Sequence, residues 1–580
     1  MTNRIILTGL AVILVCGAFG YVMYRQAHEN ARNDRGVDSG EAVPAAGNLT
    51  TDKVDSPAAA DEIADDDRTG SASDKSSDAA IAPATESNGQ AEPLPAISIA
   101  KPSAPPAPKP LFEGWVSPAA VIVFSGEQHG YIEPCGCSLN QLGGLSRRAD
   151  LLRQIGEREW PVTAFDGGGL VNNPTRQQGK LKFDMTLRCL TDMRYGAVAL
   201  GVEELQLSFD FLSYHRPDEL PFLAANILFF DDPKFTGAPL TKRVLQIGGV
   251  KIGVTAVFGM SLKADAPQAG EFQFEILEPA TSLKKVLAEL KAERPDLIIL
   301  LSHAKPDESR KLAETFPEID IVLTAGGSED PDPKPKFVGD KTLLVAPGQK
   351  GKYMAAVGYF PDAAEQKLRY ELIALDEMRF KDTPAIGQHM RDYQEELKDR
   401  NLVATELAVE DPRNAQAIDE NAFMGAKVCG ECHKSAWDVW QTTKHAGATE
   451  SLKTGREGQN NWINRVYDPE CVACHVTGWD PQKIVRYKTG YTGEQATPKL
   501  VGQQCENCHG PGGRHVELER QWAKDKKTSD ELLTWRKFQR LDKKSAFNLC
   551  AKCHDGDNDP HFDSDSFDRY WNEIAHPGKD

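Results

Sequence analysis

The sequence predicts a multidomain chain, with an α/β domain in the middle, a mainly helical domain at the C-terminus, and an apolar helix and a disordered linker at the N-terminus. Three observations predict this organisation. Short β-branched runs alternate with helical stretches in the middle, the motif C-x-x-C-H occurs four times near the C-terminus, and an apolar N-terminal run precedes a stretch almost without aromatic residues. The predicted segments are 1–25, 26–112, 116–375, 376–424 and 425–580.

The N-terminal apolar run covers residues 5–24, about twenty residues, which is enough to cross a bilayer. No convincing A-x-A cleavage site follows it, so we expect an uncleaved signal anchor, with a cleaved export signal as the alternative. Residues 26–112 are rich in Ala, Pro, Ser and acidic residues. Such a stretch buries too little apolar area to offset its chain entropy, so we expect a flexible tether.

The charge balance bears on the kind of partner. The formal net charge is -18, and the sequence contains no Lys/Arg-rich run. Nucleic acid binding needs clustered cations, so nucleic acid is excluded as an expected partner. A redox partner protein or a small-molecule ligand fits this balance better.

The four C-x-x-C-H motifs predict four covalently bound haem c groups. In each motif two thiols join one porphyrin, and the adjacent histidine ligates its iron from one side. Zinc ribbons would also use paired cysteines, but they do not require His after every second Cys. The predicted attachment residues are Cys429, Cys432, Cys471, Cys474, Cys505, Cys508, Cys550 and Cys553, and the proximal iron ligands are His433, His475, His509 and His554.

The remaining histidines of the C-terminal segment are candidate distal ligands. They are His445, His515, His561 and His576. An iron with two histidines is closed to substrate, whereas a missing sixth ligand leaves an open, reactive iron. Because haem c is attached to exported polypeptides, the motifs and the apolar run together predict a membrane-anchored protein that faces the periplasm.

The middle segment carries the pattern of an α/β domain. Its predicted helices include 144–155 and 280–292, and 376–424 is predicted to be a charged helical connector. The predicted strands are Val121–Phe124, Val162–Phe165, Ala197–Leu200, Val250–Val257, Leu297–Leu301, Ile319–Leu323 and Leu343–Val345.

This segment resembles the calcineurin-like metallophosphoesterases, in particular the five-prime-nucleotidase and UDP-sugar-hydrolase branch. The resembling strings are Gly130–Pro134, Gly143–Arg148, Ala197–Gly201, Leu301–His303 and Ile319–Val322. The resemblance implies a metallophosphoesterase-like four-layer sandwich of two sheets between helices. The fold class we expect is therefore this α/β sandwich plus a mainly α tetrahaem cytochrome c domain.

The metal ligands of that family carry over poorly. Both groups that should bridge its two metal ions are missing, because Gly169 stands at the bridging Asp position and Val202-Glu203 at the Asn-His pair. Two-metal phosphoryl chemistry needs those bridges, so nucleotidase activity is not expected. The polar residues that remain are Glu127, His129, Glu203, His303 and Glu329. They suit either one additional metal ion, such as zinc or iron, or a hydrogen-bonded relic pocket.

Cys135 and Cys137 form a C-x-C pair shortly after His129. A redox thiol site, a soft-metal site and a disulfide, one that uses Cys189 among them, all fit this pattern. The segment is similar here to nucleotidase-like proteins that are also known as selenoproteins, which favours redox chemistry. Cys135 and Cys137 are therefore the candidate catalytic residues.

The C-terminal segment resembles the tetrahaem cytochrome c-554 family. The shared strings are Cys429–Lys434 with Trp440 and His445-Ala446, then Cys471–Gly478, Pro498–Gly502, Cys505–Gly512 and His515. The resemblance implies the ligand pairs His433 with His515, His554 with His445, and His509 with His576, and an open iron at His475. The chain departs from the family pattern at Asn558–His561, where His561 is a further candidate for the fourth site or for a pocket beside the open iron.

Three functional hypotheses follow. The first is a membrane-tethered periplasmic tetrahaem cytochrome that transfers electrons, with the middle domain as a degenerate accessory. The second is an oxidoreductase that acts on a small nitrogen or sulfur compound at an open haem or at the Cys135/Cys137 pair. The third, a nucleotidase or other phosphohydrolase, is disfavoured by the missing ligands.

Overall fold

The computed structural model describes residues 109–134, 141–215, 220–230, 232, 237–267, 274–339, 341–414, 421–455 and 462–577. They all belong to one structural unit, residues 102–580. The predicted N-terminal helix, nearly all of the predicted linker, and the pair Cys135 and Cys137 lie outside the described residues. Within the described ranges, no helix is both long enough and apolar enough to cross a bilayer.

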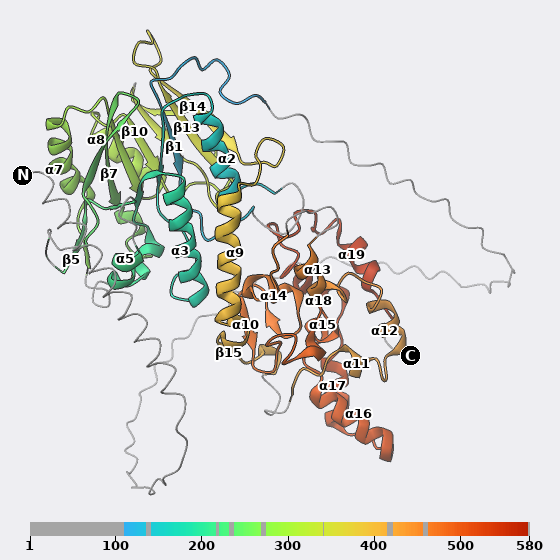
Figure 1. The fold of residues 1–580 in the computed structure, drawn as a ribbon. Coiled ribbons are helices and arrows are strands. Elements are labelled where there is room, and N and C mark those ends of the chain that lie inside the picture. The colour runs from blue at the N-terminus through green and yellow to red at the C-terminus, as the bar shows by residue number, and fades with distance from the viewer. Residues whose placement is uncertain are drawn as a thin grey trace, which may run out of the picture. The chain divides into compact units, whose positions relative to one another are not determined.

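Two six-stranded sheets form the middle domain (Figure 1). The first has the order β14-β13-β1-β2-β3-β4, in which β1 to β4 are parallel and β13 and β14 antiparallel. Its strands are β1 (Ala120–Ser125), β2 (Val162–Asp166), β3 (Tyr195–Ala199), β4 (Phe222–Leu223), β13 (Tyr353–Tyr359) and β14 (Leu368–Ala374).

The second sheet has the order β11-β12-β10-β9-β7-β6, with β7, β9, β10 and β12 parallel and an antiparallel strand at each edge. Its strands are β6 (Lys242–Ile247), β7 (Val250–Phe258), β9 (Leu297–His303), β10 (Ile321–Thr324), β11 (Lys336–Val338) and β12 (Thr342–Val345). A separate two-stranded sheet pairs β5 (Ile227–Phe229) with β8 (Phe274–Ile276). Every strand predicted from the sequence is present.

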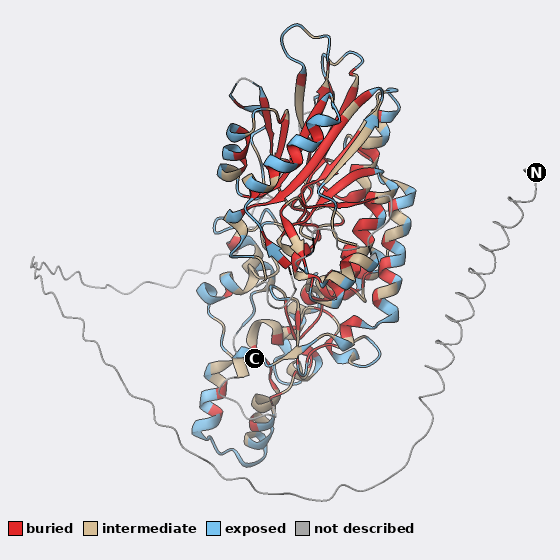
Figure 2. Cartoon of the chain, turned by 90° about the vertical axis from the view of Figure 1, so that its left-hand side faces the viewer, coloured by how far each residue is buried: buried red, intermediate tan, exposed pale blue. Residues whose placement is uncertain are grey.

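The sheets pack face to face because their strands are apolar on both faces. In β1, Ile122 and Phe124 join a buried cluster with Ile252 and Ile299 of the other sheet, while Val123 faces the opposite way. This alternation follows the two-residue period of a strand. Figure 2 shows that buried residues concentrate in these strands. The sheet-on-sheet layer is therefore the centre of the middle domain.

Helices cover both outer faces. The first sheet is covered by α2 (Leu145–Gly156) and α3 (Gln177–Asp192), and the second by α7 (Pro279–Ala292) and α8 (Pro306–Thr315). The short segments α4 (Val202–Gln206), α5 (Phe209–His215) and the 3-10 turn η1 (Met260–Leu262) lie between strands. The layers run helix, sheet, sheet, helix, as predicted.

The connector is built around α9 (Pro384–Asp399). Its residues Ile386, Met390, Tyr393 and Leu397 are buried, and their spacing of three to four places them on one face of the helix. This face packs on α3, in a cluster that also holds Cys189. Cys189 is buried, and burial raises the pKa of its thiol to about 12. The thiol of Cys189 is free, so the structure does not support the alternative in which it forms a disulfide.

The C-terminal domain is made of short helices and small sheets. The first elements after α9 are α10 (Leu402–Thr405), β15 (Ala408–Val409) and η2 (Pro412–Asn414). The strand β15 forms one small sheet with β16 (Trp479–Asp480) and β17 (Val485–Tyr487). The helices are α11 (Ala426–Cys429), α12 (Lys434–Trp440), α13 (Ala448–Thr454), α14 (Pro469–His475), η3 (Pro498–Leu500), α15 (Cys505–His509), α16 (Gly513–Asp525), α17 (Asp530–Phe538), α18 (Lys543–Cys550) and α19 (Phe567–Ile574).

Candidate haem sites

Each C-x-x-C-H motif forms one turn of helix. In the first motif the backbone N–H of His433 bonds to the carbonyl of Cys429 at 2.9 Å, and in the fourth His554 bonds to Cys550 at 2.9 Å. The second and third motifs lie within α14 and α15. Residues three and four apart in a helix lie on one face, so both thiols and the histidine of a motif can meet one porphyrin.

Three of the proximal histidines face a second histidine from a distant part of the chain. The ring centroids of His433 and His515 are 6.5 Å apart, those of His445 and His554 are 6.2 Å apart, and those of His509 and His576 are 5.9 Å apart. These are the three pairs that the family resemblance implies. A metal bonded at about 2 Å to each ring would hold the two centroids about 6 Å apart. The pairs therefore fit three irons, each with two histidine ligands.

The protonation of these rings also suits metal binding, which needs a neutral imidazole. Burial, together with His554, lowers the pKa of His445 to about 4. Burial likewise lowers the pKa values of His509 and His515. One ring nitrogen of His515, Nδ1, is buried with no hydrogen-bond partner in the described part of the chain. A buried polar atom without a partner is a reason to look for a ligand.

His475 of the second motif differs from the other proximal histidines. Its Nδ1 lies 2.7 Å from the carbonyl oxygen of Ala448, and burial lowers its pKa. That bond leaves Nε2 for an iron, yet no second histidine faces this ring among the described residues. The open iron that the resemblance implies for this motif stays a prediction.

His561, the remaining candidate ligand, is exposed. Its carbonyl accepts a hydrogen bond from the Ser566 hydroxyl at 2.8 Å, just before α19. In the structure it is the ring of His445 that faces His554. His561 therefore serves the local turn, and the fourth motif has its partner elsewhere.

The structure also brings motifs together in pairs, which sequence reasoning did not predict. The thiol of Cys429 in the first motif lies close to that of Cys505 in the third. Cys474 in the second motif likewise lies close to Cys553 in the fourth. Haems attached there would be neighbours, first with third and second with fourth.

A second group of polar residues lies at the carboxyl end of β1. His129 Nε2 is 3.3 Å from Glu127 Oε2, and His129 Nδ1 is 3.7 Å from Glu203 Oε1. Both Glu127 and His129 have a φ of 50°, a left-handed backbone that is uncommon for non-glycine residues. Burial opposes ionisation of both groups, but their mutual bond outweighs it, so the pKa of Glu127 is lowered and that of His129 raised. These three residues form what we call the β1 pocket.

Of the other two predicted members of this site, His303 lies beside it, with Nδ1 3.9 Å from Glu127 Oε1, whereas Glu329 is engaged elsewhere. His303 Nδ1 is hydrogen-bonded to the carbonyl oxygen of Gly167 at 2.8 Å, and its Nε2 accepts a hydrogen bond from the backbone N–H of Val202 at 3.3 Å. Glu329 pairs with Lys350 and Lys352 instead. Among the described residues no group of three or more potential ligands is arranged to hold a metal ion. As they lie, the five predicted residues fit a hydrogen-bonded pocket better than a metal site.

Arg148 is a buried member of this region that the sequence reasoning did not single out. Its guanidinium bonds to Ser125 and Gln128 and lies 3.7 Å from Asp166. Burial raises the pKa of Asp166 although Arg148 opposes the rise. A fixed cation therefore lies beside the ends of β1 and β2. The signal for it was the string Gly143–Arg148, noted only for its family resemblance.

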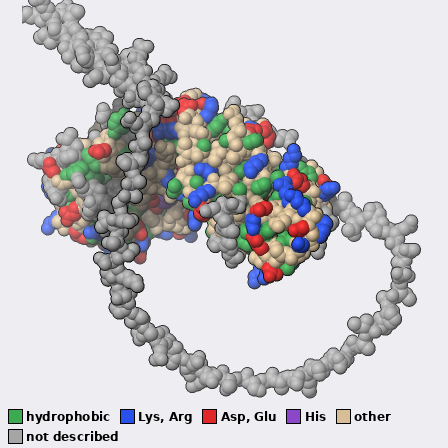
Figure 3. Space-filling view, turned by 90° about the horizontal axis from the view of Figure 1, so that it is seen from below, with side chains coloured by type: hydrophobic (Ala, Val, Ile, Leu, Met, Phe, Trp, Pro, Cys, Tyr) green, Lys and Arg blue, Asp and Glu red, His purple; other side chains and the backbone are tan. Residues whose placement is uncertain are grey.

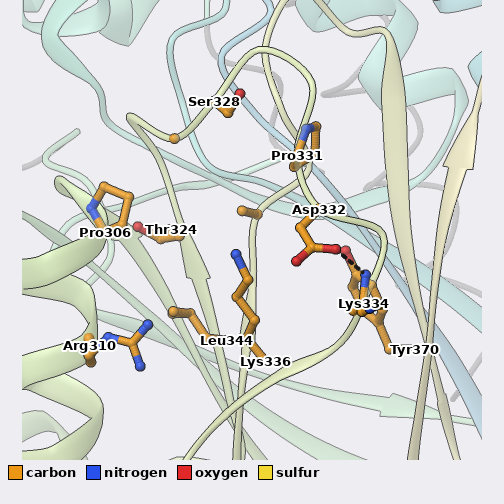
Figure 4. Close-up of a pocket in the computed structure, with 12 residues that line it drawn as sticks. Pro306, Arg310, Thr324, Ser328, Pro331, Asp332, Lys334, Lys336, Leu344 and Tyr370 are labelled. Atoms are coloured by element: carbon orange, nitrogen blue, oxygen red, sulfur yellow. Dashed lines mark hydrogen bonds between the residues drawn. The ribbon is translucent and has the colours of Figure 1, made fainter.

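A separate recess of about 140 Å³ lies at the carboxyl end of β10. Figure 4 shows the side chains of Arg310 and Lys336 extending into it, opposite Asp332. Asp332 accepts the backbone N–H of Lys334 at 3.0 Å. The lining is more cationic than acidic, and none of it belongs to the haem motifs. On the face in Figure 3, by contrast, Lys and Arg are interspersed with Asp and Glu.

Comparison with known proteins supports this division of the chain. Residues 428–510 match the family model described as cytochrome c554 and c-prime. The cytochrome c-554 of Nitrosomonas europaea is 39% identical over 97 residues, which are 16% of this chain and 39% of that protein. The predicted resemblance of the C-terminal domain is therefore confirmed, and this domain is a c-type cytochrome domain with covalently bound haem.

The middle domain has relatives of another kind. An apyrase of Aedes albopictus is 26% identical over 187 residues, which are 30% of this chain and 33% of that protein. A 5'-nucleotidase precursor from Thermus thermophilus superposes with a TM-score of 0.42 at 18% identity, covering 57% of this chain and 68% of the other. The predicted resemblance to nucleotidase-like proteins is confirmed. The chain spans only about a third to two fifths of the length of these curated relatives.

Proposed function

We propose that this protein is a membrane-tethered, periplasmic tetrahaem cytochrome that passes electrons between redox partner proteins. The observation that carries the proposal is the set of three facing histidine pairs beside four C-x-x-C-H turns. Iron held by two histidines exchanges electrons without binding substrate. The middle domain, which lacks the bridging metal ligands, serves as an accessory and not as a phosphoesterase.

The chain's own residues would hold the haems and set their properties. Bound haem supplies the one-electron chemistry, while the protein chooses ligands, burial and hydrogen bonds. His475 and His509 each have Nδ1 engaged by a backbone carbonyl, at 2.7 Å in both cases. Such a bond fixes the ring and leaves Nε2 towards the iron. The contacts Cys429–Cys505 and Cys474–Cys553 support electron passage between neighbouring haems within each pair.

Haem stoichiometry and spin state test the proposal on the exported full chain. We expect four haems per chain by the pyridine haemochrome assay, and three low-spin signals with one high-spin signal by low-temperature EPR. Fewer than four haems would contradict the tetrahaem assignment. Fractionation tests the location, since the tether predicts membrane-bound protein that externally added protease releases from spheroplasts.

The lone His475 favours one second candidate, an oxidoreductase that acts on a small nitrogen or sulfur compound at an open haem. The high-spin signal should then shift on addition of nitric oxide, and reduced protein should turn over a small substrate such as hydroxylamine or sulfite. A spectrum with only low-spin signals would remove this candidate. The Cys135/Cys137 pair is the other proposed site, and it lies outside the described residues.

A further inference from the structure

The turn behind the fourth motif is organised by its own aspartates. Asp555 Oδ1 accepts the backbone N–H of Asp557 at 3.1 Å and that of Asn558 at 2.8 Å. The N–H of Asp559 bonds to the carbonyl of Asp555 at 2.8 Å. The carboxylate of Asp559 then lies 2.8 Å from Nδ1 of His554. This turn therefore carries the carboxylate that bonds the proximal histidine, and Tyr570 also contacts that carboxylate.

Three side chains of the middle domain hold the turn at Asp557. Lys350 Nζ lies 2.8 Å from each carboxylate oxygen of Asp557, and the hydroxyl of Tyr131 donates to the same carboxylate at 2.8 Å. Gln141 donates its side-chain N–H to the Asp557 carbonyl at 2.8 Å. These contacts between described residues all meet the turn at Asp557, three positions after His554.

Lys350 is itself fixed within the middle domain. Its backbone N–H donates to the carbonyl of Glu127 at 2.7 Å, next to the β1 pocket. Its ammonium lies 3.0 Å from Glu329 and 5.4 Å from the centre of the Tyr131 ring. A lysine held along its length loses less freedom on pairing than an exposed one, so its pair with Asp557 can position the turn.

The bond to Asp559 distinguishes His554 from the proximal histidines of the second and third motifs. His475 and His509 donate to neutral backbone carbonyls, whereas His554 faces a carboxylate. A carboxylate partner makes an imidazole a more basic metal ligand. A more basic ligand favours ferric over ferrous iron and so lowers the reduction potential.

We propose that Lys350 and Tyr131 are positioning residues for the fourth haem, and that the middle domain sets the potential of that haem by holding Asp557. The inference rests on the proposed function in one respect, that a haem occupies the motif of residues 550–554. It gives the middle domain a role in electron transfer that needs no catalysis of its own.

Potentiometric titration of the four-haem protein, followed by EPR, tests the proposal. Asp559→Asn identifies the fourth haem, because it removes the carboxylate beside His554. The ferric-to-ferrous ratio of that haem at a fixed potential should fall roughly tenfold. This corresponds to a rise of about 59 mV in the reduction potential of a one-electron couple. Lys350→Met and Tyr131→Phe should raise the potential of the same haem by a smaller amount. Lys350→Arg should restore most of the original value. Lys352→Met is the matched control, because it removes the neighbouring ion pair between Lys352 and Glu329. It should not change the reduction potential of any haem.

A lowered reduction potential of the fourth haem in Lys350→Met would overturn the proposal. Loss of the Lys350 cation without any movement of the turn would favour ferric iron and lower the potential. Tyr131→Phe changes no charge, so it tests the positioning of the turn alone. An unchanged reduction potential of the fourth haem in this variant would also overturn the proposal. Wild-type protein with fewer than four haems would overturn the proposed function instead, and the haem assay detects that outcome separately.

Discussion

Gln178 of the middle domain donates its side-chain N–H to the carboxylate of Asp468 at 2.7 Å, at the start of the helix that carries the second haem motif. The same carboxylate caps α14 through the N–H of Glu470 and accepts from Gln394 of α9 at 2.8 Å. One buried aspartate thus joins the middle domain, the connector and a haem helix. The domains are therefore joined by hydrogen bonds between specific buried side chains.

Asp468→Ala should therefore destabilise the folded protein. It leaves the side-chain N–H of Gln394 without its partner, removes one of the two bonds that Gln178 donates, and removes a helix cap. Together these losses cost about 2–4 kcal/mol. Urea unfolding followed by circular dichroism measures the loss. Asp542→Ala is the matched control, because Asp542 caps α18 in the same manner but at the surface. Equal losses in the two variants would contradict a role for Asp468 beyond capping.

Each candidate distal histidine can be tested by its own variant. His515→Ala, His445→Ala and His576→Ala should each convert one low-spin haem into a high-spin haem, because each removes one of two iron ligands. Low-temperature EPR counts the signals. His561→Ala should leave the spectrum unchanged, since its ring is exposed and His554 faces His445. A new high-spin signal in His561→Ala would mean that this histidine closes an iron.

The Glu127–His129 pair predicts a pH-dependent stability. Folding raises the pKa of His129, so its contribution is complete below the ordinary histidine pKa and is lost as the pH rises through the raised value. Folding lowers the pKa of Glu127, so its contribution is lost as the pH falls through the lowered value. His129→Gln should thus destabilise more at pH 6 than at pH 9 in urea unfolding. That difference should shrink in a Glu127→Gln background, because Glu203 still faces His129.

Phosphoesterase activity should be at background. Both ring nitrogens of His303 are already bonded, and Glu329 is paired with lysines, so two metal ions cannot be held for phosphoryl transfer. Hydrolysis of AMP and of p-nitrophenyl phosphate, with added Mn²⁺ or Zn²⁺, checks this expectation. Turnover that depends on added metal and falls in His303→Ala would contradict it.

Cys135→Ser should change the redox behaviour of the protein without changing its haem content. The chemical reason is the C-x-C spacing, which suits a redox thiol pair. Spectroscopic redox titration with a haem count measures both quantities. An unchanged titration together with unchanged activity would return Cys135 to a structural role.

Much of the fold was readable from local patterns. The continuous apolar runs Val121–Phe124 and Leu297–Leu301 became strands buried on both faces. The pattern at 280–292 became α7, because a 3.6-residue period of apolar residues indicates a helix with one buried face. The pocket was less predictable. Glu127, His129 and Glu203 lie together, as predicted. Glu329 pairs instead with Lys350 and Lys352, and no sequence motif indicated these ion pairs.

The sequence by itself determined the haem chemistry, because two thiols and an imidazole within five residues must share one helical turn. The histidine pairs were implied by the family resemblance and not by spacing, and the structure brings their rings together. Only the tertiary structure decided which motifs are neighbours and that Lys350 reaches Asp557. The physical reason is separation along the chain. Spacing within one turn fixes geometry, whereas contacts between distant residues depend on how the domains pack.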